Sequence, residues 1–227
     1  MNFVFLQVGD DQRAQLFVRS IRRGVPQATV IQCTDAKTNA IDGVDRVFRH
    51  DGDAANLMTF RLEAFAQLGL KETGTYLDSD MLLLKAFDPN EALKECDVAL
   101  CERIFGKDIL INVGFKRMDW SEYLGKTFGQ VYPYLACLTI TRSNAFWIKC
   151  AQVLRELPPK FHIWYGDQEA IRNVANSDKS LKFAHLKESA YACLPEFVDG
   201  KKLPYLIHFK GKQRKRIMMD YAQRLFG

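Results

Sequence analysis

The sequence predicts an α/β fold, in which a sheet with parallel strands is flanked by helices on both faces. The main observation is an alternation: short apolar runs that favour strands are followed by segments with apolar residues at helical spacing, twice within residues 3–80. The composition agrees with this class, because 48% hydrophobic and 26% charged residues are ordinary values for a soluble globular enzyme. The chain has 227 residues, enough to bury a sizeable core, and we expect residues 1–227 to form a single domain.

The first strand–helix–strand unit begins at the N-terminus. Residues 3–8 form an apolar strand, and residues 11–23 form a helix with apolar residues on one face. Asp10 or Asp11 is placed to cap the first turn of this helix. Residues 28–33 then form a second, buried strand. The order predicts a right-handed crossover between two parallel strands.

The second unit repeats the pattern. Residues 44–48 form a third strand, residues 56–68 form an apolar helix that Gly69 ends, and a further strand leads to Asp78. In open α/β sheets, ligands bind at the carboxyl ends of the strands. Asp10 and Asp78 both follow a predicted strand, so we expect both at a nucleotide-type site.

The remainder of the chain is less regular. Residues 103–134 are interrupted by glycines and a proline, and a stretch this long without periodicity is more often functional than not, so it could bind an acceptor or form a lid. The other elements that the sequence predicts are strands at 97–101, 134–141, 181–186 and 204–209, and helices from Ser143 or Asn144 to 157, from Asp167 to 174, and over 216–225.

Composition also bears on location and partners. No apolar run approaches the roughly 20 residues that a membrane span needs, and the N-terminus resembles a strand and lacks the basic leader of a signal peptide. The six cysteines are scattered without a C-x-x-C pair, which indicates reduced core thiols and a cytoplasmic protein. The net charge of +5 is concentrated in residues 210–216, a cluster that could meet a nucleotide, a nucleic acid or an anionic membrane, or could be an ordinary solvated helix face.

Asp78 and Asp80 are the strongest candidates for a metal site. On an extended backbone, residues two apart point to the same side, so the two carboxylates converge unless the chain turns there. Two carboxylates inside an apolar run repel each other and need a cation or a proton between them. A hard divalent ion that also binds phosphate oxygens is the usual solution, although a strand end with two solvated aspartates would explain the pattern too.

His208 is the histidine with the most suggestive setting. It ends an apolar strand and precedes Lys210 and Gly211, a basic loop that suits a phosphate, because glycine permits close approach of the backbone. Lys212, Arg214 or Lys215 would neutralise the phosphate oxygens. With Asp78 and Asp80, His208 could bind Mn²⁺ or Mg²⁺, and the imidazole favours manganese.

Asp167, Gln168 and Glu169 follow an aromatic segment and Gly166. The acids at the start of a helix are explained by capping and by the helix dipole, but Gln168 is explained less well.

Four short motifs resemble, in order, those of GT-A-fold glycosyltransferases, and most closely the retaining galactosyl- and glucosyltransferases of family 8. This family includes bacterial lipopolysaccharide enzymes and glycogenin. The motifs are Phe60-Arg61-Leu62, Tyr76-Leu77-Asp78-Ser79-Asp80, Gly166-Asp167-Gln168-Glu169 and Ile207-His208-Phe209-Lys210-Gly211. They span about 150 residues, and each is weak alone. The resemblance implies a Rossmann-like nucleotide-diphospho-sugar transferase fold with a mixed central sheet flanked by helices.

The same resemblance implies roles for the site residues. Asp78, Asp80 and His208 would hold Mn²⁺ or Mg²⁺ on the donor diphosphate, and Arg61 would contact the Asp-x-Asp motif or the donor. The residues that would bind the donor are Asp10, Arg61, Gly211, Lys212 and Arg214, the last at the position of the family lysine. Asp167 would hold hydroxyls of the donor sugar, and Gln168 would lie beneath the anomeric carbon. The family's K-P-W is absent after residue 211, and Leu135-Ala136-Cys137 replaces its N-A-G.

The resulting hypothesis is a metal-dependent hexosyltransferase that moves a sugar from a nucleotide-diphosphate donor, a UDP-sugar, to a saccharide or lipid-linked acceptor with retention. Inversion would instead require a base such as Asp167 or Glu169. Two alternatives stay open: a haloacid-dehalogenase-type phosphatase, which also uses Asp-x-Asp, and a non-catalytic module that binds an anionic ligand through residues 210–216. The sequence shows no basic stripe interleaved with aromatics, so we expect no nucleic-acid partner. The basic cluster leaves open a peripheral contact with the inner membrane face.

Overall fold

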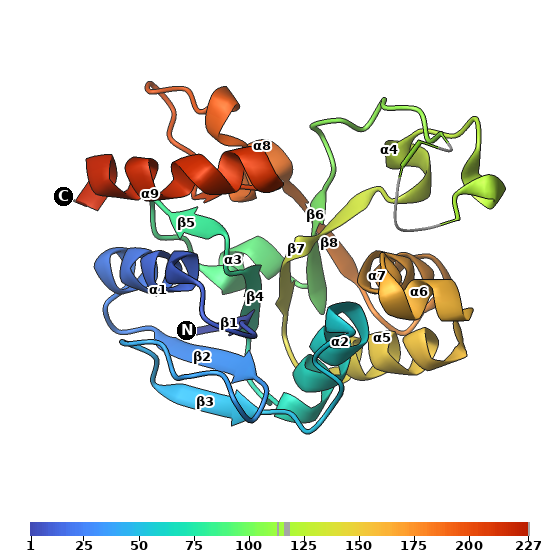
Figure 1. Ribbon diagram of the computed structural model, residues 1–227, viewed down its shortest axis with the longest axis horizontal. Helices are drawn as coiled ribbons and strands as arrows, with labels where there is room; N and C mark the ends of the chain where they lie inside the picture. Colours follow the sequence, from blue (N-terminus) through green and yellow to red (C-terminus); the bar gives the residue numbers. More distant parts are fainter. Residues whose placement is uncertain (113, 116–118, 227) are drawn as a thin grey trace.

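The computed structural model describes residues 1–112, 114–115 and 119–226 of the chain (Figure 1). Within these residues, a seven-stranded sheet in the order β3-β2-β1-β4-β7-β6-β8 forms the centre of the molecule, and a second sheet contains two strands, β5-β9. The strands of the large sheet are β1 (Asn2–Leu6), β2 (Thr29–Thr34), β3 (Arg46–Arg49), β4 (Gly74–Asp78), β6 (Val98–Glu102), β7 (Tyr134–Thr141) and β8 (Phe183–Lys187). Those of the small sheet are β5 (Met81–Leu83) and β9 (Leu206–His208).

Helices cover both faces of the large sheet. They are α1 (Gln12–Gly24), α2 (Leu57–Leu68), α3 (Pro89–Leu93), α4 (Phe128–Val131), α5 (Ala145–Glu156), α6 (Pro159–Ile163), α7 (Gly166–Ser177), α8 (Glu188–Tyr191) and α9 (Lys212–Phe226), with 3₁₀ turns η1 (Ser121–Tyr123) and η2 (Pro195–Phe197). One buried cluster joins the sheet to α1 and α3, and another joins its opposite face to α2, α5 and α7 (Figure 1). The strands β1, β2 and β4 are therefore buried along nearly their whole length.

The predicted α/β fold with a mixed sheet is confirmed. Strands β1, β2, β3 and β4 are parallel, as two strand–helix–strand units require. Strand β7 is antiparallel to both of its neighbours, β4 and β6. The reason lies in the connection: no crossover helix carries the chain back across the sheet between β6 and β7 in the described residues, so the chain enters β7 beside the end at which it leaves β6. Strand β8 returns to the parallel direction beside β6.

Local signals placed several element ends correctly. The side chain of Asp11 caps α1, accepting a hydrogen bond from the backbone N–H of Arg13 at 2.9 Å. Helix α2 ends before Gly69, and α5 begins after Asn144, as predicted. Strand β3 lies at Arg46–Arg49, two residues later at its start than predicted.

Two helix starts differ from the prediction. Helix α9 begins at Lys212, four residues before the predicted start at 216, so most of the basic cluster lies in its first turns and not in a loop. Helix α7 begins at Gly166, with Tyr165 as its N-cap residue in the left-handed region (φ +61°). Asp167 therefore lies inside the first turn and is not the cap.

The region 103–134, predicted as irregular, contains η1, α4 and a hydrophobic cluster of its own. Its buried aromatic residues include Trp120, Tyr123, Phe128 and Tyr132, and Tyr165 packs against them. The Trp120 and Tyr165 rings meet edge to face, with centroids 4.9 Å apart. This cluster holds the segment against the start of α7. Its aromatic residues follow no helical or strand period, which is why periodicity did not reveal it.

The small sheet is the feature that assembles the candidate site. Strand β5 follows β4 after a two-residue turn and pairs antiparallel with β9, which places Met81 opposite His208. Residues far apart in the sequence are thereby brought to one edge of the large sheet. The six cysteines are free and five are buried, as predicted for core thiols. Among the helices in the described part of the chain, none has the length and apolar character to cross a membrane.

Candidate functional site

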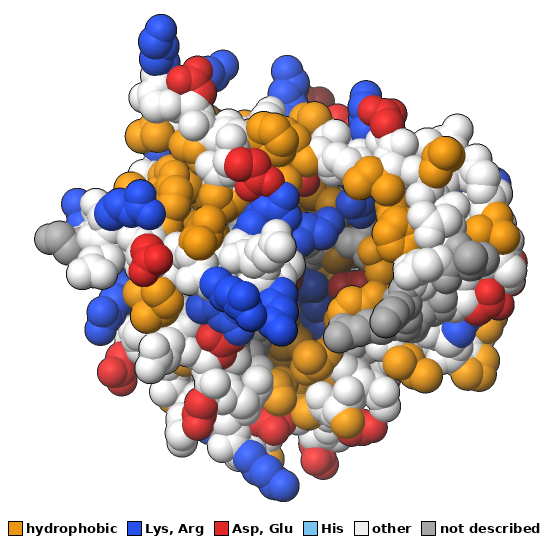
Figure 2. All heavy atoms as spheres, turned by 45° about the horizontal axis from the view of Figure 1, so that its top comes forward, with side chains coloured by type: hydrophobic (Ala, Val, Ile, Leu, Met, Phe, Trp, Pro, Cys, Tyr) orange, Lys and Arg blue, Asp and Glu red, His pale blue; other side chains and the backbone are white. Residues whose placement is uncertain are grey.

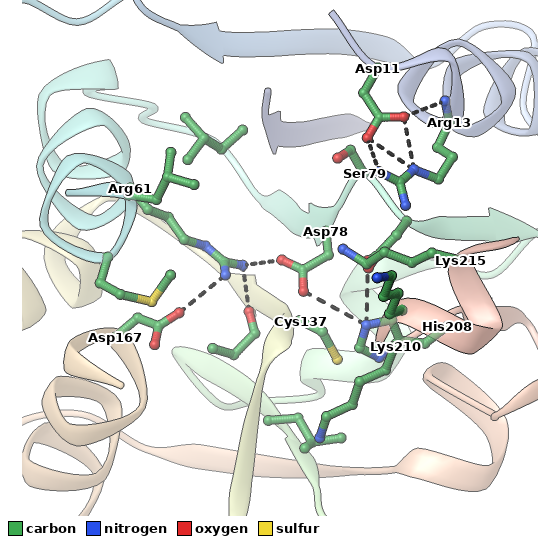
Figure 3. Close-up of a pocket in the computed structure, with 18 of the residues that line it drawn as sticks. Asp11, Arg13, Arg61, Asp78, Ser79, Cys137, Asp167, His208, Lys210 and Lys215 are labelled. Atoms are coloured by element: carbon green, nitrogen blue, oxygen red, sulfur yellow. Dashed lines mark hydrogen bonds and ion pairs between the residues drawn. The ribbon is translucent and has the colours of Figure 1, made fainter. Parts of the chain in front are cut away.

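Asp78 and Asp80 converge, but through a turn and not along one extended strand. Asp78 is the last residue of β4, and Ser79 and Asp80 form the turn before β5. The turn is fixed from both sides: Ser79 Oγ donates to Gln7 Oε1 at 2.9 Å, and the Phe209 N–H donates to the Asp80 carbonyl at 2.9 Å. Both carboxylates consequently line the same pocket, and Figure 3 shows Asp78 pointing towards His208 there.

His208 completes a three-residue cluster. Its Nε2 lies 3.4 Å from Asp80 Oδ1 and 3.8 Å from Asp78 Oδ2, and one ligand atom from each residue falls within 4.8 Å of the others. Asp80 and His208 are buried, whereas Asp78 is partly exposed to the pocket. The pairing of β5 with β9 sets this geometry, because it places the residue after Asp80 opposite His208.

The charges in the cluster are compensated. Lys215 Nζ lies 2.7 Å from Asp80 Oδ2. Burial alone raises the pKa of Asp80, but the ion pairs with His208 and Lys215 outweigh burial and hold this pKa below its usual range. Burial lowers the pKa of His208, whereas the neighbouring Cys137 and Asp80 raise it, and the net pKa is well above the ordinary value. These neighbours favour the protonated imidazole, whereas a metal ion would bind its neutral form.

These residues fit a divalent metal ion. Two carboxylates and one imidazole are ligands that suit Mn²⁺. Asp80 Oδ1 is buried and makes no hydrogen bond to the described residues, since His208 Nε2, at 3.4 Å, is too far away for a strong one. Ligand atoms at right angles on one ion, each about 2.1 Å away, lie about 3 Å apart, which is close to the separations of 3.4 and 3.8 Å around His208 Nε2.

Arg61 links the cluster to the other half of the site. Its Nη2 lies 2.8 Å from Asp78 Oδ1 and donates to the Ala136 carbonyl at 2.6 Å, and its Nη1 donates to Asp167 Oδ2 at 3.2 Å. The residue is only 8% exposed. Although burial lowers the pKa of Arg61, the carboxylates of Asp78 and Asp167 raise it above the ordinary value, so the guanidinium stays charged.

Gln168 is held against an open part of β7. Strand β4 pairs with β7 only as far as Leu138, so the residues of β7 before it lack a strand neighbour on that side. With its amide oriented to satisfy both groups, Gln168 Nε2 donates to the Tyr134 carbonyl at 2.7 Å and Oε1 accepts from the Ala136 N–H at 2.6 Å. The Gln168 side chain therefore takes the place of a neighbouring strand.

Asp167 is buried next to Gln168 on the first turn of α7. Its Oδ1 accepts a hydrogen bond from the Gln168 N–H at 2.7 Å. Burial raises the pKa of Asp167, and Arg61 offsets only part of this rise. The position depends on Gly166, because a Cβ there would lie 2.1 Å from the Phe161 carbonyl oxygen.

Not every residue of the basic cluster faces the site. Arg214 forms a two-pronged ion pair with Glu196, with Nε 3.0 and 2.9 Å from the two oxygens, and does not line the pocket. Lys212 and Arg216 do line it. Gly211 does so too; its φ of +85° favours glycine, and a Cβ there would meet no atom within 4 Å. The structure thus places Arg214, expected at the donor, outside the pocket.

A pocket with a volume of about 1170 Å³ surrounds these residues. This is more than the roughly 300–1,000 Å³ of a typical small-molecule site. Figure 2 shows Lys and Arg side chains gathered around the hollow. Its lining includes Asp10, Asp11, Arg13, Leu57 and Met58, the residues Arg61, Asp78, Asp80, Asp167, Gln168 and His208 described above, and also Arg103, Leu135, Trp164, Tyr165 and Lys210.

Some pocket residues were not singled out from the sequence. Arg13 pairs with Asp11, with Nε 2.8 Å from Asp11 Oδ1. Cys137 lies beside His208, and burial raises the pKa of its thiol. Arg103 follows the predicted strand at 97–101, and this position at a strand's carboxyl end was the signal that could have identified it.

Comparisons with known proteins place the fold. A scan against models of protein families finds no match, and a search of curated proteins also finds none. Solved structures match over nearly the whole chain. The galactosyltransferase LgtC, solved with donor and acceptor sugar analogues, is 14% identical, with a TM-score of 0.60 over 100% of this chain and 97% of that one.

Two larger proteins match as well. The glycosyltransferase GlyE of Streptococcus pneumoniae has a TM-score of 0.63 at 14% identity over 97% of this chain, which spans 59% of GlyE. The bifunctional glycosyltransferase WbbM has a TM-score of 0.62 at 14% identity over 100% of this chain, which spans 50% of WbbM. Likeness at this identity shows the fold, so the chain has the GT-A fold of these glycosyltransferases, as its sequence predicted.

Proposed function

We propose that this protein is a metal-dependent glycosyltransferase that moves a hexose from a nucleotide-diphosphate sugar, a UDP-sugar, to a saccharide or lipid-linked acceptor with retention. The observation that carries the proposal is the convergence of Asp78, Asp80 and His208 in the main pocket of a GT-A fold. Two carboxylates beside an imidazole would bind Mn²⁺ or Mg²⁺, and the ion would stabilise the charge that develops on the leaving diphosphate.

The donor would lie along the pocket from α1 towards α7. Asp10, at the end of β1, is exposed at the edge of the pocket where the nucleoside would lie. Lys212 and Arg216 lie one helical turn apart on α9 and line the pocket, so their charges would neutralise the diphosphate, together with backbone groups at Gly211. Because Arg214 is paired with Glu196, we do not give it the role of gripping the diphosphate.

The sugar would lie over Asp167 and Gln168. Arg61 and the Gln168 N–H hold the Asp167 carboxylate in place. In this position the carboxylate can orient sugar hydroxyls, but any movement away would break both contacts. Gln168 is tied to β7 by both ends of its amide, and its oxygen keeps one lone pair. A fixed carbonyl dipole of this kind would stabilise positive charge at the anomeric carbon.

The surroundings of the acids favour retention. An inverting enzyme needs a carboxylate base near the acceptor hydroxyl. Asp167 is committed to Arg61, and Glu169 does not line the pocket. Glu169 is buried in an ion pair with Arg172 and accepts from Tyr123 Oη at 3.3 Å. Neither acid is free to act as a general base.

The two alternatives that the sequence left open receive no support. The fold is the one seen in glycosyltransferases, which argues against a phosphatase of the haloacid dehalogenase type. Several residues of the basic cluster line the same pocket as the carboxylates, which argues against a separate surface for an anionic partner.

The proposal is tested with donors. Thermal unfolding is measured with UDP-glucose, UDP-galactose and GDP-mannose, each with and without Mn²⁺, and release of the nucleoside diphosphate is followed by chromatography. A donor at 100 times its Kd stabilises the folded protein by about 2.7 kcal/mol. We expect stabilisation by a UDP-sugar that depends on Mn²⁺ and is lost in His208→Ala, whereas His162→Ala, outside the pocket, retains it.

Two results would contradict parts of the proposed function. If no donor raises the unfolding temperature and none is hydrolysed, the function is wrong. If a donor binds equally well with and without Mn²⁺, the metal dependence is wrong while the transferase assignment stands. The anomeric configuration of the product, determined by ¹H NMR, decides between retention and inversion.

A further inference from the structure

The pocket holds more cations than the proposed donor needs. Among the described residues that line it, Arg13, Arg61 and Lys215 each have a carboxylate partner. Four further cations lining it have no ion pair with a carboxylate in this part of the chain: Arg103, Lys210, Lys212 and Arg216. Lys212 and Arg216 share a face of α9 and suit the diphosphate. Arg103 and Lys210 are left without a role.

Arg103 is held in one place before any ligand binds. It follows β6, its Nε donates to the Tyr132 carbonyl at 2.8 Å, and its guanidinium lies over the Phe128 ring, 5.7 Å from the centroid. Its two Nη nitrogens make no hydrogen bond to the described residues, so their N–H groups are available to a ligand. The backbone that follows Arg103 is fixed as well. The buried carboxylate of Glu188 accepts hydrogen bonds from the N–H groups of Ile104 and Phe105 at 2.5 and 2.7 Å. A fixed guanidinium with free donors is a prepared anion site.

Lys210 supplies a second charge at the same end of the pocket. Figure 3 shows its side chain running away from Asp11 and Arg13. Although the residue is exposed, the pocket walls and the charge of Arg103 lower the pKa of Lys210. Glu188 is the carboxylate that interacts with both cations, and its Oε2 is already occupied by two N–H groups. Asp78 also acts on Lys210, but it is paired with Arg61, so Arg103 and Lys210 are left without a carboxylate partner of their own.

We propose that Arg103 and Lys210 bind an anionic group, a phosphate or a carboxylate, carried by the saccharide acceptor. This inference rests on the proposed function and names the class of acceptor. The donor's nucleoside and diphosphate are assigned to the end formed by Asp10, Gly211 and α9. The Lys210 side chain lies on the far side of Asp78 and His208 from Asp11 and Arg13 (Figure 3), and Arg103, which lines the same pocket, is close enough to interact with its charge. A neutral acceptor would cover two unpaired cations and remove them from water, which is unfavourable, whereas an anionic acceptor satisfies both.

The test uses small probes on the protein saturated with UDP and Mn²⁺, so that the diphosphate site is already filled. Isothermal titration compares glucose 6-phosphate and glucuronate with glucose, and inorganic phosphate shows whether the anion alone is sufficient. We expect both charged sugars to bind at least 10-fold more tightly than glucose. Arg103→Gln and Lys210→Gln should each weaken glucose 6-phosphate binding about 10-fold while leaving UDP affinity unchanged.

Matched controls are Arg155→Gln and Lys201→Gln, which remove exposed cations far from the pocket lining and should change neither affinity. Lys210 is exposed, so its variant is expected to fold even if Arg103→Gln does not. Two results would overturn the acceptor assignment while leaving the proposed function intact. One is equal binding of glucose and the charged sugars, and the other is charged-sugar binding that neither pocket variant weakens. Loss of UDP affinity in these variants would move the two cations to the donor and overturn it too. If wild-type protein binds neither UDP nor a UDP-sugar, the proposed function fails, and the acceptor assignment fails with it.

Discussion

The two halves of the large sheet satisfy their backbone hydrogen bonds in different ways. In the half formed by β3, β2, β1 and β4, neighbouring strands are parallel, and each pair of strands keeps a single register along its length. In the half formed by β7, β6 and β8, the register of β6 against β7 shifts between Leu100 and Cys101, and β4 leaves β7 at Leu138. Side chains of Arg61 and Gln168 complete the hydrogen bonding that strands supply elsewhere.

This difference explains how the pocket is built. The regular half delivers Asp78 at the end of a strand, where sheet geometry alone sets its position. The irregular half opens β7 so that helices α2 and α7 can each send a polar side chain to the strand backbone. Groups fixed to the backbone in this way lose little entropy when substrate binds, which suits electrostatic stabilisation of a transition state. The regular half therefore contributes Asp78 to the candidate metal cluster, and under the proposed function the irregular half contributes the residues beneath the sugar.

The largest effect is expected at the candidate metal cluster, where the regular half meets the small sheet. Asp80→Asn removes one carboxylate charge from the metal cluster but keeps its size. We expect transfer activity at saturating Mn²⁺ to fall about 1000-fold, as for the loss of a major electrostatic group. The measurement is donor turnover, with Asp42→Asn as a matched control, because Asp42 is exposed and outside the pocket. Retained activity in Asp80→Asn would show that the Asp78–Asp80–His208 cluster does not hold a catalytic metal.

The second-largest effect is expected at Arg61, which contacts residues of both halves. Arg61→Met leaves Asp78 and Asp167 without their shared cation and the Ala136 carbonyl without its donor. Removing one partner of a buried ion pair costs about 4 kcal/mol, so we expect the free energy of unfolding to fall by that amount in denaturant titrations. Adding Asp167→Leu to Arg61→Met should restore part of the loss, because one unpaired charge is then gone. If the double variant is no more stable than Arg61→Met, the guanidinium does not act through Asp167.

The start of α7 tests the irregular half by itself. In Gly166→Ala the new Cβ would lie 2.1 Å from the Phe161 carbonyl oxygen and 2.7 Å from Leu154 Cδ1, so the turn must shift. We expect a loss of about 3 kcal/mol in the free energy of unfolding, together with reduced activity, because Gln168 moves with the turn. Gly200→Ala, where no atom lies within 4 Å, should change stability by less than about 0.5 kcal/mol. Similar stability of the two variants would contradict the packing argument.

The halves also differ in how much of them the sequence reveals. The strands and helices of the regular half follow from apolar periodicity and from capping residues such as Asp11 and Gly69, because local and overall preferences agree there. The carboxylates Asp78 and Asp80 are recognisable for the same reason: they stand at a strand end. His208 is found by the same reasoning, although nothing in its own segment indicates that β9 pairs with β5 in a separate sheet.

The irregular half depends on contacts between distant residues. The role of Gln168 requires a strand that loses its neighbour, and no local pattern around residue 134 shows where β4 stops. In the basic cluster, Arg214 and Lys215 are adjacent in sequence but about 100° apart around a helix, so only the exact start of α9 decides which one meets Asp80. That start lies outside the reach of apolar periodicity, because the first turn is wholly polar.

The smallest effect separates structure from function at Gln168. Gln168→Met removes both hydrogen bonds to β7, and we expect a loss of about 2 kcal/mol in the free energy of unfolding. The regular half offers a matched control: buried Gln32 donates to the Asn39 carbonyl at 3.0 Å and accepts from the Ile41 N–H at 2.9 Å, outside the pocket. Gln32→Met should lose similar stability while the folded enzyme keeps its turnover number. Gln168→Met should in addition lower the turnover number, because under the proposed function it also removes the amide dipole beneath the sugar. Turnover is measured well below the unfolding temperatures of both variants. If the two turnover numbers are equal, Gln168 only stabilises the structure by bonding to β7, and the irregular half does not contribute to catalysis through it.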